Sequence, residues 1–286
     1  MAPATPEAVP TLLTRAELTL VGRLDDASNA TFAVRLAGTS APDVAPPRYA
    51  VYKPVAGEQR LSDFPAGTLA HREAACFRLS QETGWGLVPP TILRDGPYGP
   101  GSVQSWVHPH PVADPAEDLP AVPDPGGGVV DLFLAGGLPE GWLPVLEGLG
   151  ARGERLVLAH ADLPRLRRLA LLDAVVNNAD RKGGHVLADH TGVPFGVDHG
   201  LTFHVEPKLR TVLWGWAGQR FLDAEREALD HLDTTLRRDG RLRADLTAFL
   251  STEEIEATVG RVRALRAEDR FPAPDPGRRA VPWPLF

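Results

Sequence analysis

Runs of alternating apolar and polar residues dominate the first part of the chain and predict β-strands. Two such runs, 18–24 (LTLVGRL) and 30–38 (ATFAVRLAG), flank a stretch of turn-forming residues at 25–29 (DDASN). We therefore expect these two runs to form a hairpin. A third run, 48–55 (RYAVYKPV), predicts another strand that ends at Lys53 and the proline after it.

Helical spacing replaces this alternation in residues 67–84 (GTLAHREAACFRLSQETG), where apolar side chains recur every three or four positions. This period predicts a helix, and Gly84 is suited to end it. Two further strands are expected within 88–107, on either side of a turn rich in glycine and proline. Strands, one helix and more strands in this order predict a small antiparallel sheet with one helix.

Helices are expected to dominate the second half of the chain. A stripe of leucine, alanine and valine predicts a helix over 163–176, with Asp162 as its N-cap and Pro164 in its first turn. The capping-box sequence STEE, which begins at Ser251, predicts a second helix that runs to about Glu268.

The segment between these halves, 108–153, is rich in proline, glycine and acidic residues. We expect only short helices within it, at 129–149. Residues 124–131 (DPGGGVVD) are interpreted as a surface linker, with a lid over a binding site as the alternative. Beyond the helix at 163–176, a loop and a short hairpin at 185–198 are expected.

Together these elements predict an α+β fold with two lobes. The expected boundaries are a disordered tail at 1–12, a sheet-bearing N-terminal lobe at 13–108 and a mainly helical C-terminal lobe at 109–286. A chain of this length is suited to one large domain or to two coupled lobes.

Composition and charge narrow the functional classes. The chain has 286 residues, of which 43% are hydrophobic and 23% charged, as is typical of a soluble globular protein. A net charge of -7 argues against a nucleic-acid coat and against attachment to anionic lipid by charge. No run approaches the roughly 18 apolar residues of a membrane span. We expect neither nucleic-acid binding nor integral membrane association.

Cys76 is the single cysteine, which excludes a disulfide framework within the chain. It falls within the helix predicted at 67–84, where a buried structural thiol is expected rather than a nucleophile. The N-terminus lacks the charged and apolar regions of a signal peptide. These features predict a protein of the cytoplasm.

Two aspartates carry the candidate chemistry. Asp180 lies in NNADRKGGHVL (177–187) and Asp198 in FGVDHGLTF (195–203), each in a short break between apolar runs. The hairpin between them would bring the two carboxylates close, and close carboxylates need a cation between them. Two functional interpretations of these aspartates follow. They could bind a divalent ion together with a polyphosphate, or one of them could act as the general base for a hydroxyl. The alternatives are a polar turn and a helix cap.

The N-terminal half supplies the groups that such a site needs. Lys53 ends a predicted strand and Glu73 lies in the predicted helix twenty residues later. A strand lysine that pairs with a helix glutamate and reaches phosphate oxygens is the arrangement of kinase small lobes.

Two further segments complete this hypothesis. The predicted hairpin turn, with Ser28 and Asn29 as donors, lies where a loop covering phosphates would lie, although no G-x-G-x-x-G is present. The segment GSVQSWV lies at the expected lobe junction, where its backbone, at Gln104, Trp106 and Val107, could hydrogen-bond an adenine.

These blocks also carry a family resemblance. VYKPVAGE, GSVQSWV, NNADRKGGHVL and GVDHGLTF resemble the corresponding blocks of the phosphatidylinositol 3-/4-kinase superfamily. The type II phosphatidylinositol 4-kinases are most similar and HipA-type protein kinases more distant. The match covers residues 18–216, and the whole chain also resembles an actinobacterial group of kinase-like proteins.

The resemblance implies a bilobal kinase-like fold that binds ATP between the lobes with Mg²⁺ or Mn²⁺. It implies that Lys53 contacts phosphates and is oriented by Glu73. It further implies that Asp180 orients and deprotonates the acceptor hydroxyl, and that Asp198 binds the metal.

One position departs from the pattern of these families. Five residues after the catalytic aspartate they carry an asparagine metal ligand, whereas this chain has His185. A neutral imidazole binds divalent ions and suits Mn²⁺ better than Mg²⁺. We therefore expect Mn²⁺ to support activity at least as well as Mg²⁺; the alternative is that His185 only packs or caps the loop.

The sequence thus predicts an ATP-dependent phosphotransferase that acts on a hydroxyl acceptor. The acceptor is a protein, possibly the chain itself, a small molecule or an inositol lipid head group. A catalytically weak nucleotide-binding pseudokinase and an AMP transferase on the same fold are the alternatives. Trp214 and Trp216 are interpreted as packing residues, with an acceptor platform as the alternative.

Overall fold

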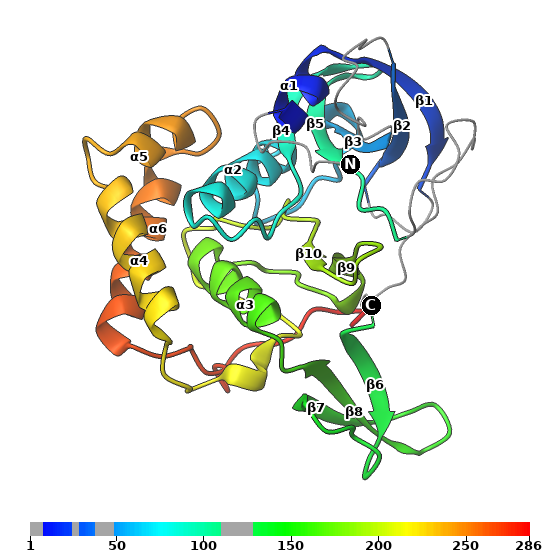
Figure 1. Cartoon of the computed structure of the whole chain (residues 1–286), viewed down its shortest axis with the longest axis vertical. Coiled ribbons are helices and arrows are strands. Elements are labelled where there is room, and N and C mark those ends of the chain that lie inside the picture. The colour runs from blue at the N-terminus through cyan, green and yellow to red at the C-terminus, as the bar shows by residue number, and fades with distance from the viewer. Residues whose placement is uncertain (1–7, 25–28, 38–48, 110–127) are drawn as a thin grey trace.

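The computed structural model describes residues 8–24, 29–37, 49–109 and 128–286. A five-stranded antiparallel sheet forms the N-terminal part (Figure 1). In spatial order its strands are β1 (Glu17–Arg23), β2 (Phe32–Ala37), β3 (Tyr49–Pro54), β5 (Gly99–Ser105) and β4 (Thr91–Gly96). The expected pairing of the first two strands is confirmed, with Leu20 opposite Val34.

The helix α2 (Leu69–Glu82) packs against β4 and β5 and is buried along most of its length. It ends at the expected position, because Gly84 has a φ of +68° and its N–H donates to Gln81 O at 3.0 Å. A residue with a side chain rarely adopts this left-handed conformation. Cys76 lies fully buried within α2, as expected, and burial raises the pKa of its thiol well above the ordinary value.

The disordered tail expected at 1–12 is not observed for residues 8–12. Residues Ala8–Arg15 form the helix α1, and the side chains of Leu12 and Leu13 are buried against the sheet. The two adjacent leucines supply enough apolar surface to hold this short helix on the sheet. Residues 1–7 lie outside the described residues.

The prediction of short helices within 129–149 was wrong. This region forms a second antiparallel sheet with strands in the order β6 (Val130–Leu134), β8 (Arg155–Ala161) and β7 (Trp142–Leu149). Gly136, Gly141 and Gly153 adopt positive φ in the turns between these strands. Short apolar runs fit a strand or a helix equally well, and here the glycine turns favour strands. Residues 124–127 of the expected linker lie outside the described residues.

Helices make up most of the remaining chain. They are α3 (Pro164–Val176), α4 (Asp223–Thr235), α5 (Arg241–Leu246) and α6 (Thr252–Glu268), with short 3₁₀ turns at Val55–Gly57, Gly183–His185 and Trp214–Trp216. The predicted α+β architecture, a small antiparallel sheet followed by a mainly helical part, is confirmed.

The start of α6 forms as the sequence predicted. Ser251 is the N-cap, its hydroxyl accepts a hydrogen bond from Glu254 N at 3.3 Å, and Glu254 Oε2 accepts one from Ser251 N at 2.9 Å. The start of α3 differs from the prediction. Leu163 is its N-cap, while Asp162 instead accepts a hydrogen bond from the indole N–H of Trp216 at 2.9 Å.

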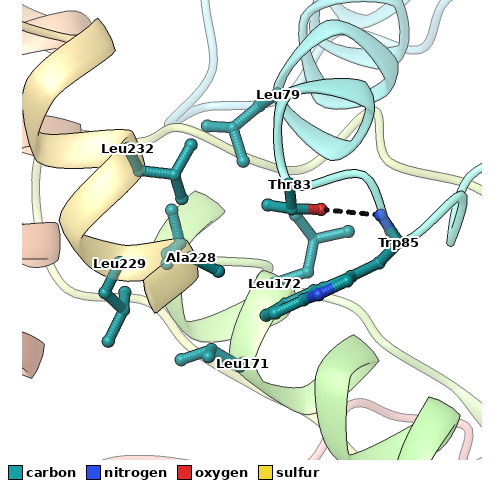
Figure 2. A pocket seen from close by; sticks show the side chains of 9 residues that line it. Leu79, Thr83, Trp85, Leu171, Leu172, Ala228, Leu229 and Leu232 are labelled. Atoms are coloured by element: carbon teal, nitrogen blue, oxygen red, sulfur yellow. Dashed lines mark hydrogen bonds between the residues drawn. The ribbon is translucent and has the colours of Figure 1, made fainter. Parts of the chain in front are cut away.

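The largest hydrophobic core joins α2 to α3, α4 and α6. A cavity of about 10 Å³ lies between α2, α3 and α4 (Figure 2). Its lining consists of Leu79, Thr83, Trp85, Leu171, Leu172, Val175, Ala228, Leu229 and Leu232. The walls are almost entirely apolar, so the cavity offers a water molecule too few polar partners. We interpret it as a packing gap.

Among the described residues, no helix combines the length and the apolar character needed to cross a membrane. The hairpin of β9 (Val186–Ala188) and β10 (Pro194–Gly196) forms within the predicted range 185–198. It connects the two segments that carry Asp180 and Asp198.

Candidate functional site

Lys53 lies near the end of β3, and its ammonium group contacts two carboxylates. Its Nζ lies 2.6 Å from Glu73 Oε1 and 2.9 Å from Asp198 Oδ1. Burial alone would lower the pKa of Lys53, but Asp198 and Glu73 outweigh it and hold the pKa above the ordinary value. Lys53 is therefore a permanent cation between the sheet, α2 and the segment after β10.

Asp198 follows β10 and adopts a left-handed backbone conformation with a φ of 55°. For a residue other than glycine such a conformation costs on the order of 1 kcal/mol. Burial alone would raise the pKa of Asp198, but the adjacent Lys53 ammonium outweighs it and lowers the pKa, so the carboxylate stays ionised. Its side chain remains 46% exposed, which leaves room for a further cation or ligand.

Asp180 lies in the loop that follows α3. The helix ends at Asn177, which is left-handed, and the amide oxygen of Asn178 accepts a hydrogen bond from Asp180 N at 3.0 Å. Burial raises the pKa of Asp180, and Asp198 adds to this effect while Lys182 opposes it. The Lys182 Nζ lies 3.2 Å from Asp180 Oδ2. A partly buried carboxylate with a raised pKa is suited to accept a proton.

His185 brings this loop to Asp198. Its Nδ1 lies 2.8 Å from the carbonyl oxygen of Asp180, and a carbonyl can only accept, so Nδ1 carries the proton. The lone pair of Nε2 then faces Asp198 Oδ2 at 3.4 Å. Burial lowers the pKa of His185 to about 4, so the ring is neutral near pH 7.

The His185 nitrogen and the Asp198 oxygen are two electron-pair donors that face each other without a proton between them. This pair fits one divalent cation, since imidazole and carboxylate are both common ligands. Within the described part of the chain, no group of three or more His, Cys, Asp or Glu residues could hold a metal. Water and phosphate oxygens would supply further ligands, as is usual for Mg²⁺ bound with a nucleotide.

A buried ion pair supports both aspartate segments. Arg181 and Asp173 are fully buried, and their side chains approach to 3.0 Å. Arg181 Nη1 also donates to His185 O at 2.9 Å and to Val197 O at 2.7 Å. Arg181 therefore links the loop of Asp180 directly to the residue that precedes Asp198.

The sequence interpretation did not assign roles to Arg181, Asp173 or Lys182. One signal was available, because Asp173 is the charged residue within the apolar run 169–176 (LALLDAVV) of this helix. A buried carboxylate needs a cation, and Arg181 and Lys182 are the nearest cations that follow it in the sequence.

Two of the residues expected to bind the nucleotide, Asn29 and Gln104, use their side chains in hydrogen bonds within the protein. Asn29 Oδ1 accepts a hydrogen bond from Gln59 N at 2.7 Å, which ties the predicted phosphate-covering turn to the segment after β3. The Gln104 side chain is engaged inside the sheet, where its Nε2 donates to Thr91 Oγ1 at 2.8 Å. Ser28 lies outside the described residues.

The end of β5 keeps one donor for a ligand. The N–H of Trp106 donates to Tyr49 O at 3.2 Å and so continues the sheet. The N–H of Val107 has no hydrogen-bond partner among the described residues, although the side chain is buried. Of the segment predicted to contact adenine, Val107 is therefore the residue whose backbone N–H can still donate.

The two tryptophans predicted to pack do so to different degrees. Trp216 is buried and lies against His160, with ring centroids 4.3 Å apart. Trp214 is half-buried and its indole N–H donates to Ala280 O at 2.8 Å. Both indole N–H groups are thus engaged within the protein, which favours the packing interpretation over an acceptor platform.

Comparison with known proteins gives one clear relative. The Mycobacterium tuberculosis protein Rv2133c is 45% identical over 276 residues, an alignment that covers 96% of this chain and 94% of the relative. The crystal structure of the Helicobacter pylori proinflammatory kinase CtkA aligns with a TM-score of 0.42 and 10% identity, over 91% of this chain and 94% of that chain. No protein-family model matches the chain.

Proposed function

We propose that this chain, which belongs to the family of the mycobacterial protein Rv2133c, is an ATP-dependent phosphotransferase that acts on a hydroxyl acceptor. The observation that carries the proposal is the position of Lys53, whose ammonium contacts both Glu73 on α2 and Asp198. In protein kinases a lysine of the third strand pairs with a helix glutamate and holds the phosphates of ATP. Lys53 likewise lies on the third strand, β3, and its pairing with a helix glutamate supports the proposal.

ATP would bind with its phosphates at Lys53 and its adenine beside Val107. Asp198 and His185 would hold a divalent cation, Mg²⁺ or Mn²⁺, which when bound neutralises charge on the phosphate oxygens. The pair formed by Lys53 and Glu73 is buried on the glutamate side, which fixes the ammonium group in the direction of the phosphates.

Asp180 would align the acceptor hydroxyl and take its proton as the oxygen attacks the γ-phosphorus. The new bond joins the acceptor oxygen to phosphorus, the bond between the γ-phosphorus and the β–γ bridging oxygen breaks, and ADP leaves. Lys182, beside the Asp180 carboxylate, would stabilise negative charge that develops on the transferred group.

The acceptor is proposed only as a class. A protein, possibly the chain itself, a small molecule and an inositol head group all present the hydroxyl that Asp180 would align. The proposed limits of the two lobes are residues 13–108 and 109–286, with the nucleotide at their junction.

A pseudokinase remains the competing function, since a histidine stands at the asparagine position and the glycine-rich phosphate motif is absent. The test is to measure ATP binding and autophosphorylation for the wild-type protein and for Asp180→Asn. We expect both to bind ATP, and only the wild type to gain about 80 Da per phosphate by intact mass; an AMP transferase would instead add about 329 Da.

The matched control is Asp239→Asn, which alters an exposed carboxylate and should leave phosphotransfer unchanged. ATP binding without transfer by the wild type, to itself or to any hydroxyl acceptor tested, would favour the pseudokinase. Transfer that survives in Asp180→Asn would contradict the role of Asp180 as the base.

A further inference from the structure

His199 connects three segments of the proposed site, although it touches neither the nucleotide nor the acceptor in the mechanism above. It follows Asp198 directly and is fully buried. Its backbone N–H donates to Glu73 Oε2 at 2.9 Å. The same glutamate that orients Lys53 therefore also fixes the backbone beside Asp198.

The imidazole of His199 makes a second connection, to the loop of Asp180. Its Nε2 lies 2.6 Å from Arg181 Nη2, and a guanidinium can only donate, so Nε2 is the acceptor. A neutral ring that accepts at Nε2 carries its proton on Nδ1.

The other ring nitrogen faces α2. His199 Nδ1 lies 3.9 Å from Glu73 Oε2, beyond hydrogen-bond distance, and is buried without a hydrogen-bond partner among the described residues. A leucine or phenylalanine would fill this space without leaving a polar atom unpaired. The accepting nitrogen is therefore the feature that an apolar residue could not replace.

The turn around His199 is held from a further side. The Thr202 hydroxyl donates to His199 O at 2.7 Å, and Arg72 Nη1 donates to Thr202 O at 2.6 Å. Arg72 also forms an ion pair with Glu254 of α6. The segment 198–202 is thus clamped between α2 and the helical part, and His199 is its link to the loop of Asp180.

We propose that His199 is a positioning residue, which couples the pair of Lys53 and Glu73 to Arg181 and thereby sets the Asp198 carboxylate relative to Asp180. This inference rests on the proposed function for its catalytic consequence. Its structural consequence, a correctly placed cation ligand at Asp198, can be measured without turnover. Groups that orient metal ligands typically contribute 10–100-fold to metal affinity or activity.

The test compares His199→Leu, which cannot accept from Arg181, with His199→Gln, whose side-chain oxygen can. Mn²⁺ affinity is measured by electron paramagnetic resonance in the presence of a non-hydrolysable ATP analogue, and kcat and KM for ATP are measured in parallel. Ser80→Ala is the matched control. Ser80 lies on α2, is buried like His199, and its hydroxyl has no hydrogen-bond partner among the described residues.

We expect His199→Leu to weaken Mn²⁺ binding by about tenfold and to lower kcat by at least about tenfold, at the lower end of the range for such residues. The KM for ATP should change little, and His199→Gln should recover most of both losses. Should the leucine variant fail to fold, Thr202→Val is the substitute, because it removes the hydrogen bond from the Thr202 hydroxyl to His199 O. We then expect Mn²⁺ affinity and kcat each to fall by about threefold.

Unchanged Mn²⁺ affinity in His199→Leu, or in Thr202→Val where that variant is the one that folds, would overturn the proposal. Equal losses in the leucine and glutamine variants would also overturn it, because they would indicate a purely structural role. If the wild type transfers no phosphate but Mn²⁺ binding follows the predicted order, the proposed function fails and the positioning role of His199 stands.

Discussion

The Nε2 atom of His185 lies 3.4 Å from Oδ2 of Asp198 while the opposite ring nitrogen donates to the backbone of Asp180. The hydrogen bond to Asp180 O keeps the proton of the His185 ring on Nδ1. The lone pair of Nε2 therefore faces the Asp198 carboxylate. If a divalent cation binds as proposed, the residue at position 185 would influence which ion is preferred.

Replacement of His185 by asparagine should shift metal preference towards Mg²⁺. An amide oxygen is a harder ligand than an imidazole nitrogen and suits Mg²⁺ better. We expect the ratio of activity with Mn²⁺ to activity with Mg²⁺ to fall by about tenfold, which corresponds to about 1.4 kcal/mol of differential binding. ATP turnover measured with each ion checks this. A wild-type protein with a strong Mg²⁺ preference would contradict His185 as a ligand.

Lys182 should matter for transfer and not for nucleotide binding. Its ammonium lies beside the Asp180 carboxylate, which places it near the transferred group rather than near the Lys53 end of the site. We expect Lys182→Met to lower kcat by about 10²-fold, the effect of losing one electrostatic stabiliser, with ATP affinity nearly unchanged. Steady-state kinetics and calorimetry on the same variant check both parts; equal losses in both would contradict this assignment.

The buried pair of Arg181 and Asp173 should be among the most sensitive positions in the protein. Loss of one partner leaves an uncompensated buried charge, which costs about 3–5 kcal/mol. We expect Asp173→Ala to lower the free energy of unfolding by this order, as measured by urea denaturation. The exposed pair of Arg155 and Glu147 is the control, and Glu147→Ala should cost less than about 1 kcal/mol.

Stability should fall between pH 6.5 and pH 4, in part through His160. This side chain is fully buried, and burial lowers its pKa to about 4, below the usual value near 6.5. In that window the unfolded chain binds a proton at His160 that the folded chain does not, so acid favours unfolding. The expected loss is on the order of a few kcal/mol and is shared with His185, whose pKa is lowered in the same direction.

Urea denaturation at several pH values measures this slope. In His160→Gln, which keeps an acceptor for the N–H of Gly215, the slope between pH 4 and 6.5 should become shallower. An unchanged slope in that variant would show that His160 does not contribute to it.

Local signals predicted the parts of the fold that depend on local chemistry. The capping box at Ser251, the glycine stop at Gly84 and the alternation along the first three strands each correspond to an interaction made within a few residues or along one sheet. Residues 129–149 were predicted wrongly, because short apolar runs between glycines carry no period that separates a strand from a helix.

The candidate site was predictable where its charged residues need a partner of opposite charge. Lys53, Glu73, Asp180, His185 and Asp198 were expected together, and the structure brings them together. The hydrogen bond of the Gln104 side chain to Thr91 was not predictable, because it depends on which strand lies beside it, which a single sequence does not show. The same limit applied to the contact of Arg181 with His199, which lies eighteen residues further along the chain.

The central claim is that Lys53, His185 and Asp198 hold one polyphosphate together with one divalent cation. The most direct measurement is an anomalous difference map from crystals soaked with Mn²⁺ and a non-hydrolysable ATP analogue. The account predicts one Mn²⁺ peak bonded to the Asp198 carboxylate and to Nε2 of His185, with phosphate oxygens in hydrogen-bond contact with Nζ of Lys53. A nucleotide or a Mn²⁺ peak bound away from these three side chains would contradict it.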